Sequence, residues 1–358
     1  GLSSRVAALQ VNRATLLDDT VLQLRSVMHP SQFKKPLKVV FVGEEAIDAG
    51  GVTKEFFQLL SARLFNPDFG MFVDLPVSHK VWFNIGAVDD SLGDFELIGK
   101  LVGLAIYNRV LLDITFPVAL YKKLLGLPLT LEDLAEVEPA VGKSMQQLLD
   151  YAGDDVEDVF CLTFSYGYED LSGERKTVNL KEGGEAIAVT NANRPEFVDL
   201  VVGWTLGTAV ERQYTAFARG FVVVMDGPAL ELFCPEELDV LVSGTPDLEF
   251  VELEKVAVYD GGFTRTSPAV KVFWEVVHDM TPEQQRKLLL FVTGSAKAPI
   301  GGLGKLNLKI QRNGVDSVWL PTASTCFNTL LLPAYGDKAT MRQRLLTAIE
   351  ECAGFGLE

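Results

Sequence analysis

The tetrapeptide Ser243-Gly244-Thr245-Pro246 constrains the fold of this chain more than any other stretch. It is short and polar, it combines glycine with proline, and it separates two segments that both show helical patterns. A chain of 358 residues is long enough for roughly two or three domains, each with its own apolar core. We therefore expect at least two folded bodies that are joined at this tetrapeptide.

Composition narrows the class of protein. With 48% hydrophobic and 22% charged residues, the chain resembles an ordinary globular protein. Its net charge of −16 argues against DNA or RNA, whose binding rests on basic patches, and is compatible with a basic protein partner. No run of about 18 apolar residues predicts a membrane span. The four cysteines lie far apart without metal-binding spacing, so we expect no metal or cofactor, and reduced thiols in the cytosol or nucleus.

Apolar periodicity predicts a mainly helical segment before the linker. Residues 37–42 are β-branched and apolar, which indicates a buried strand, and Thr53 is placed to cap the helix after it. Three short strands separated by turn residues predict a small β-containing insert within the helices. The expected strands are 160–164, 177–180 and 187–190, and the expected helices are 97–112, 117–125, two within 129–151, 235–242 and a long region 196–225 bent at Gly203, Gly207 or Gly220.

The segment after the linker mixes helices and strands. Helices are expected at 270–278, at 282–292 with Thr281 as the cap, and at 338–352. Residues 306–310 alternate between apolar and polar, which predicts an amphipathic strand. Residues 293–304 are rich in glycine and proline and are expected to form a loop.

Cys326 stands where a polar run meets an apolar run. Residues 322–325 are small and polar, which predicts a loop, and residues 330–332 are all leucine, which predicts a buried strand. A cysteine at such a junction is partly open to solvent, as a reactive thiol must be. Core filling is the alternative, because free cysteine is among the most buried residue types. We expect Cys161 to lie in the core, and we expect Cys234 and Cys352 to be structural.

The residues around Cys326 favour acyl transfer over peptide hydrolysis. A cysteine protease needs a histidine base and an orienting group, and none of the three histidines lies in a segment typical of a catalytic loop. Sequence leaves open whether one of them approaches Cys326 in space. Exchange of a thiol onto an activated thioester needs a thiolate and correct positioning, without a strong base.

Several stretches of the chain resemble HECT-type ubiquitin ligases. The Cys326 segment reads LPTASTCFNTLLLP and is similar to the active-site signature of that family. Further matches occur in the family's order, and together they cover essentially the whole chain: GEEAIDAGGVTKEFFQLL, FNPDFGMF, LIGKLVGLAIYN, FTRTSPAVKVFWEVV, LLLFVTG and the terminal GFG. The similarity is closest to the subgroup with the HERC ligases and the papillomavirus-oncoprotein-associated ligase.

The resemblance implies a bilobal α+β fold. Residues 1–243 would form a large, mainly helical N-lobe, with a conjugating-enzyme-binding subdomain near residues 140–200. Residues 244–246 would form a hinge, so that Gly244, Thr245 and Pro246 let the small lobe turn. Residues 247–358 would form the smaller α/β C-lobe that carries the catalytic cysteine.

The resemblance also implies a reaction and its partners. Cys326 would accept ubiquitin from a ubiquitin-conjugating enzyme as a thioester and pass it to a lysine of a protein substrate. Thr325 would position the thioester, Phe355 would anchor the C-terminal tail, and Glu358 would orient the lysine. Many relatives carry histidine where this chain has Ser324, which puts a general base at that position in doubt.

In the family, the conjugating enzyme binds a hydrophobic groove on the β-containing insert. The matching positions are Val141, Phe160, Leu162 and Phe197. Core packing is the alternative for each residue. If Phe197 is a docking residue, Phe197→Ala should weaken binding of the conjugating enzyme and leave stability nearly intact. If Phe197 is a core residue, the substitution should mainly lower the melting temperature. The competing class of function is a catalytically silent scaffold that binds ubiquitin or the conjugating enzyme. The intact Thr-Cys-Phe-Asn sequence and Phe355 argue against that class.

Overall fold

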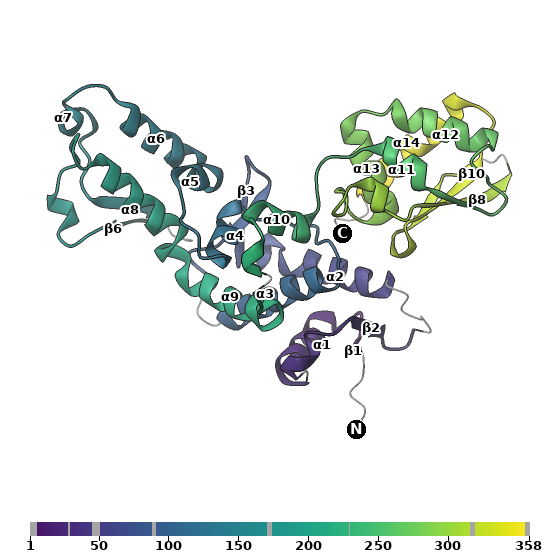
Figure 1. Cartoon of the computed structure of the whole chain (residues 1–358), viewed down its shortest axis with the longest axis horizontal. Helices are drawn as coiled ribbons and strands as arrows, with labels where there is room; N and C mark the ends of the chain where they lie inside the picture. The colour runs from purple at the N-terminus through teal and green to yellow at the C-terminus, as the bar shows by residue number, and fades with distance from the viewer. Residues whose placement is uncertain are drawn as a thin grey trace. The chain divides into compact units, whose positions relative to one another are not determined.

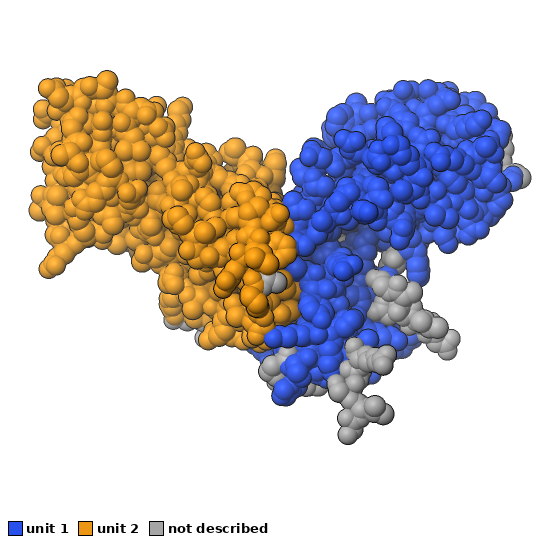
Figure 2. All heavy atoms as spheres, viewed as in Figure 1, with its two compact units in different colours: residues 1–63, 105–113, 240–358 blue, residues 64–104, 114–239 orange. Residues whose placement is uncertain are grey.

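The structure is a computed structural model that describes residues 6–27, 29–44, 51–87, 91–169, 174–228, 230–315 and 319–354. Its elements are labelled in Figure 1, and packing divides it into two compact units of mixed helices and strands (Figure 2). Unit 1 comprises residues 1–63, 105–113 and 240–358, and unit 2 comprises residues 64–104 and 114–239. The predicted linker lies inside unit 1, close to the start of its last segment, and the lobe boundary at residues 243 and 244 stays a prediction.

Unit 2 is mainly helical. Its helices are α3 (Leu92–Tyr107, the last turn in unit 1), α4 (Val118–Leu124), α5 (Leu131–Val137), α6 (Pro139–Asp150), α7 (Val156–Phe160), α8 (Arg194–Leu206) and α9 (Glu211–Met225), with 3-10 turns η3 (Pro67–Phe69), η5 (Gly184–Ala186), η6 (Thr208–Val210) and η7 (Leu230–Leu232). Two antiparallel hairpins complete it: β3 (Phe72–Leu75) with β4 (Lys80–Phe83), and β5 (Ser165–Glu169) with β6 (Arg175–Asn179). Helices α3 and α9 touch along their backbones, because a Cβ at Gly99 would meet the carbonyl of Phe217.

The small insert differs from its prediction. The strand expected at 160–164 is wrong: α7 runs to Phe160, and the amide of Cys161 donates to the carbonyl of Glu157 (3.1 Å), closing one more helical turn. Cys161 then takes a left-handed conformation (φ 48°) and is exposed, which corrects its expected place in the core. The strand expected at 187–190 is also wrong, since Ala188 forms an isolated bridge with Thr163. The long helical region breaks at Gly207, one of its three predicted bends.

The N-terminal part of unit 1 contains a pair of strands, and the apolar pattern of the sequence predicts only one of them. β2 (Leu37–Phe41) confirms the expected buried strand, and β1 (Ala7–Val11) pairs with it in parallel. The elements around the pair are α1 (Leu16–Leu22), the π-helical turn η1 (Gln23–Val27), the 3-10 turn η2 (Pro30–Gln32) and α2 (Gly51–Leu64). Thr53 was expected as the cap of α2 but lies within the helix and is buried, because the helix already includes Gly51.

The C-terminal part of unit 1 is a four-stranded sheet with helices packed on it. Strand order is β7-β8-β10-β9, with β8 parallel to β7 and β10, and β9 antiparallel to β10. The strands are β7 (Val258–Asp260), β8 (Lys309–Val315), β9 (Thr322–Ser324) and β10 (Thr329–Ala334), joined by the 3-10 turns η8 (Leu303–Lys305) and η9 (Thr325–Phe327). The helices are α10 (Pro235–Ser243, across the unit boundary), α11 (Phe250–Val256), α12 (Pro268–His278), α13 (Pro282–Thr293) and α14 (Lys338–Gly354).

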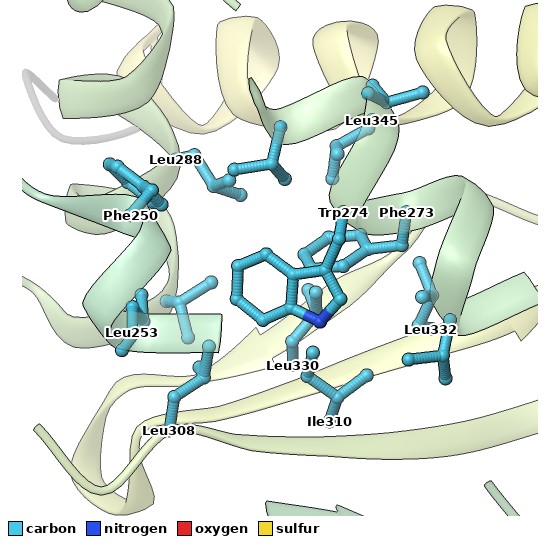
Figure 3. Close-up of a cluster of buried hydrophobic side chains, with 14 of the residues drawn as sticks. Phe250, Leu253, Phe273, Trp274, Leu288, Leu308, Ile310, Leu330, Leu332 and Leu345 are labelled. Carbon is cyan, nitrogen blue, oxygen red and sulfur yellow. The ribbon is translucent and has the colours of Figure 1, made fainter. Parts of the chain in front are cut away.

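One apolar core joins these helices to the sheet. Leu330 and Leu332 of β10 point into it beside Trp274 of α12, as Figure 3 shows. The indole nitrogen of Trp274 donates to the hydroxyl of Tyr259 (2.9 Å), so its polar atom is satisfied at the edge of the core. The strand expected at 306–310 starts later, at Lys309. The predicted cap of α13 is confirmed: the hydroxyl of Thr281 accepts a bond from the amide of Gln284 (3.3 Å).

The predicted hinge residues have defined backbone roles. Gly244 follows α10 in the left-handed region (φ +78°), where a Cβ would also crowd the carbonyl of Ala298, so this turn requires glycine. Thr245 and Ala298 exchange two backbone hydrogen bonds of 2.9 Å each. Along the described ranges, no helix combines the length and apolar character that crossing a membrane requires.

Candidate active site

The segment around Cys326 is a tight turn between two strands. Residues 322–324 were expected to be a loop but form the edge strand β9, paired with β10 from Thr329 to Leu331. Residues 325–328, named here the cysteine turn, connect the two strands. The amide of Asn328 donates to the carbonyl of Thr325 (3.3 Å), and Asn328 takes a left-handed conformation (φ 47°, ψ 44°). Asparagine tolerates that conformation better than most residues, so the Thr-Cys-Phe-Asn sequence suits the turn.

The apolar core anchors the cysteine turn. Leu330 and Leu332, just beyond it, are fully buried. The carbonyl of Asn328 accepts from the amide of Lys309 on β8 (2.9 Å), and the hydroxyl of Thr329 donates to the carbonyl of Phe327 (3.2 Å). The backbone on the C-terminal side of Cys326 is therefore fixed by β10 and β8. The Cys326 side chain lies outside the described side chains, and Phe355 and Glu358 lie outside the described residues.

The N-terminal part of unit 1 also contacts the cysteine turn. The ammonium group of Lys54, in α2, donates to the carbonyl of Thr325 (3.3 Å) and to the side-chain oxygen of Asn328 (3.0 Å). Thr325 itself is half-buried, and Phe327, the residue after Cys326, exposes 61% of its surface. Sequence reasoning missed Lys54, although the stretch GGVTKEFF that contains it is part of the family resemblance.

Two of the histidines considered as protease bases have other partners. The imidazole of His278 lies 2.7 Å from a carboxylate oxygen of Glu254, and His29 lies 2.9 Å from the hydroxyl of Ser31. The described residues also hold no cluster of three or more His, Cys, Asp and Glu side chains suited to a metal ion. The cysteine turn therefore combines an anchored backbone with a lysine that donates hydrogen bonds to it.

Polar side chains link the helices of the insert that carries the four predicted docking residues. The guanidinium of Arg194, at the start of α8, donates to the carbonyls of Leu148 (3.1 Å) and Tyr151 (2.7 Å) at the end of α6. The amide group of Asn191 bonds the carbonyl of Gly153 (2.6 Å) and the amide of Val156 (3.2 Å), at the start of α7. The NANRPE stretch thus holds α6, α7 and α8 in one arrangement and sets where Phe160 emerges.

The four predicted docking residues divide into two groups. Val141, Phe160 and Leu162 are half-buried and reach the surface of unit 2. Phe197 exposes only 2% and packs edge-on against Phe164, with ring centroids 5.5 Å apart, so its side chain belongs to the core of the subdomain. The burial of Phe197 changes what its replacement should do, from loss of binding to loss of stability.

Val141 also lines an aromatic groove within unit 2. The groove contains Tyr166 and Trp204, whose ring centroids are 5.2 Å apart, and Tyr168, whose ring is tilted against that of Trp204 with centroids 4.8 Å apart. Burial raises the pKa of the Tyr166 hydroxyl above its ordinary value. Sequence reasoning missed this groove, because its aromatic residues come from a hairpin and a helix that are separated along the chain.

Comparison with known proteins adds to this geometry. A family model described as HECT-domain (ubiquitin-transferase) matches residues 58–358. The chain is 44% identical over 349 residues to "Probable E3 ubiquitin-protein ligase HERC3" of Homo sapiens, covering 98% of this chain and 33% of that protein. It is 41% identical over 364 residues to "Probable E3 ubiquitin-protein ligase HECTD2" of Mus musculus, covering 98% and 46%. For "Probable E3 ubiquitin-protein ligase HUL4" of Eremothecium gossypii the identity is 39% over 362 residues, covering 97% and 43%.

Proposed function

The chain belongs to the HECT-domain family of ubiquitin transferases, and from that premise we propose that it carries ubiquitin as a thioester on Cys326. The Cys326 thiolate attacks the thioester carbonyl carbon that links ubiquitin to a conjugating enzyme, and the conjugating enzyme leaves as its own thiolate. A substrate lysine amine then attacks the new thioester, an isopeptide bond forms, Cys326 leaves as thiolate, and the amine loses a proton to solvent. The observation that carries this proposal is the cysteine turn, whose backbone is anchored by the buried strand β10 and by hydrogen bonds from the Lys54 ammonium.

The chain spans about one third to one half of the length of the relatives it matches. Substrates, lysine linkage and the preferred conjugating enzyme therefore remain proposals about the whole protein. We place the reaction in the cytosol or nucleus, because thiolate chemistry needs a reduced cysteine. Imaging of the full-length protein in cells tests that location, and an extracellular or membrane-bound signal would contradict it.

The conjugating enzyme is proposed to dock on the insert of unit 2. Val141, Phe160 and Leu162 offer apolar contacts at the surface, and Phe197 supports them from the core. Partly exposed aromatic side chains with rigid backing often dominate the energy of a protein interface. The net charge of −16 would steer a basic face of the enzyme toward this chain.

A gel experiment tests the proposed function directly. The chain is mixed with a conjugating enzyme charged with ubiquitin, and the products are separated with and without reductant. A band that is heavier by one ubiquitin and disappears with reductant supports the thioester. Binding of the conjugating enzyme without any such band would instead support the silent scaffold.

The C-terminal tail is proposed to act in the second step. Phe355 would anchor the tail and Glu358 would orient the acceptor lysine. We expect Phe355→Ala to form the Cys326 thioester at the wild-type rate but to release ubiquitin to lysine at least about tenfold more slowly, since lost positioning costs rate. A chase of the preformed thioester with free lysine measures this. Leu357→Ala is the matched control, and equal lysine transfer by both variants would contradict the role of Phe355.

The linker is proposed to be the hinge that presents one thiol to two partners in turn. Thr245 is tied by its backbone to Ala298, which belongs to the predicted C-lobe, so Thr245 would move with that lobe. The rotation would then be concentrated at Gly244, whose φ of +78° already lies in a region that glycine explores freely. The lobes would be residues 1–243 and 247–358.

We expect Thr245→Pro to slow ubiquitin transfer from the conjugating enzyme while each predicted lobe stays folded. Proline fixes φ, and it also removes the amide that donates to the Ala298 carbonyl (2.9 Å). Thr245→Ala keeps that amide and should transfer ubiquitin like wild type. Single-turnover transfer, with circular dichroism as the check on folding, measures both variants. Normal transfer by Thr245→Pro would remove the hinge proposal.

A further inference from the structure

We infer that Lys54 is a positioning residue for Cys326, holding the cysteine turn and favouring the thiolate. This inference rests on the proposed function of Cys326. Lys54 and the turn are 271 residues apart along the chain and meet within unit 1. Nothing in the composition of either segment would pair them.

The two acceptors of the Lys54 ammonium flank Cys326 in the sequence. One acceptor, the carbonyl of Thr325, belongs to the peptide bond that leads into Cys326, and the other is the side chain of Asn328, two residues after it. The Thr325 carbonyl also accepts the amide of Asn328, so one oxygen joins the turn to α2. Lys54 is half-buried, which limits the water that competes for these bonds.

A cation in this place assists the attack by Cys326 while the cysteine turn contacts α2. A lysine next to a cysteine lowers the pKa of the thiol and raises the fraction of thiolate, which is the attacking form. Rotation of the predicted C-lobe about residues 244–246 would carry the turn away from Lys54, so this help belongs to the arrangement in which the two are in contact. Charge-assisted hydrogen bonds from Lys54 also hold the backbone of the turn more firmly than neutral bonds would.

The other charged side chains on neighbouring elements have partners or face solvent. Lys309 on β8 lies 3.7 Å from a carboxylate oxygen of Asp260, and Lys287 on α13 lies 3.1 Å from one of Glu283. Arg286, also on α13, is exposed. Lys54 is the cation whose hydrogen bonds reach the turn itself.

Helix α2 provides a matched control one turn further along. The side-chain amide of Gln58 donates to the carbonyl of Gly294 (2.9 Å), in the loop after α13. Gln58→Ala therefore removes a contact between α2 and the C-terminal part of unit 1 without touching the cysteine turn. Loss of packing alone would affect Gln58→Ala and Lys54→Met alike, whereas loss of positioning would affect only Lys54→Met.

The experiment compares wild type, Lys54→Met, Lys54→Arg and Gln58→Ala as the whole chain. Alkylation of Cys326 by iodoacetamide is followed by mass spectrometry of the peptide that contains Cys326. The pH is varied from about 6 to about 10, because this range brackets the ordinary pKa of a thiol. We expect Lys54→Met to slow alkylation about tenfold at pH 7 and to move its midpoint to higher pH, since one pKa unit corresponds to a tenfold change. Lys54→Arg and Gln58→Ala should stay near wild type, and the exposed thiols of Cys161 and Cys234 serve as internal references.

The outcomes distinguish a failure of the role of Lys54 from a failure of the proposed function of Cys326. Equal alkylation profiles for Lys54→Met and Gln58→Ala would overturn the role of Lys54, and unchanged circular dichroism shows whether each variant is folded. Because alkylation needs no ubiquitin, its result stands even if wild type forms no ubiquitin adduct, which would refute the proposed function alone. If the role of Lys54 and the thioester function of Cys326 are both supported, Lys54→Met should also slow the transfer of ubiquitin from the conjugating enzyme to Cys326 by a similar factor.

Discussion

We expect the replacement of Cys326 with alanine to abolish the reductant-sensitive adduct with ubiquitin, and no other substitution considered for this chain should have so large an effect. Without the thiol there is no atom on the cysteine turn to form the thioester. Cys326→Ser should give a slower adduct that survives reductant, because a hydroxyl forms an oxygen ester in place of a thioester. The measurement is the charged-enzyme gel, run with and without reductant for each variant.

The exposed thiols of Cys161 and Cys234 provide the control for this prediction. Either could in principle exchange with a charged conjugating enzyme, since exposure is one requirement for thiol exchange. Cys161→Ala and Cys234→Ala should each keep the full adduct. A reductant-sensitive adduct on Cys326→Ala that is lost when Cys161 or Cys234 is also replaced would move the nucleophile to that residue.

Sequence patterns predicted the surroundings of Cys326 better than its contacts. The run of leucines after it indicated a buried strand, and β10 confirms it. The polar residues before it suggested a loop, because Thr, Ala and Ser carry no apolar signal, yet they pair with β10 as an edge strand. The bonds from Lys54 join segments 271 and 274 residues apart, so no local pattern could indicate them.

The insert shows how a period-2 pattern can mislead. Phe160, Leu162 and Phe164 alternate with smaller residues, which favoured a strand. In the structure the alternation spans a helix end, a left-handed Cys161 and an isolated bridge, and the fully buried Val156 helps to fix the helix. Tertiary contacts from Asn191 stabilise this conformation, and they join residues 38 and 35 positions apart along the chain, beyond the reach of local propensity.

The exposure of Phe160 and the burial of Phe197 set opposite expectations for their alanine variants. Phe197→Ala leaves a cavity beside Phe164 and should lower the free energy of unfolding of unit 2 by about 3–5 kcal/mol. Phe160→Ala removes a half-buried ring that packs edge-on against Tyr151, with centroids 5.4 Å apart. Its cost in stability should be smaller, about 1–2 kcal/mol.

Binding of the conjugating enzyme should follow the opposite order once folding is controlled. Phe160→Ala should weaken binding at least about tenfold, as loss of an aromatic anchor at an interface does. Phe197→Ala should bind nearly as well as wild type at a temperature where it is still folded, since its side chain lies behind the surface. Urea unfolding and titration with the conjugating enzyme at low temperature measure the two quantities separately. The contrary outcome is a Phe197→Ala variant with the free energy of unfolding of wild type and much weaker binding of the conjugating enzyme. Phe197 would then be a contact residue that the conjugating enzyme reaches by opening the subdomain. The assignment of its side chain to the core would fail.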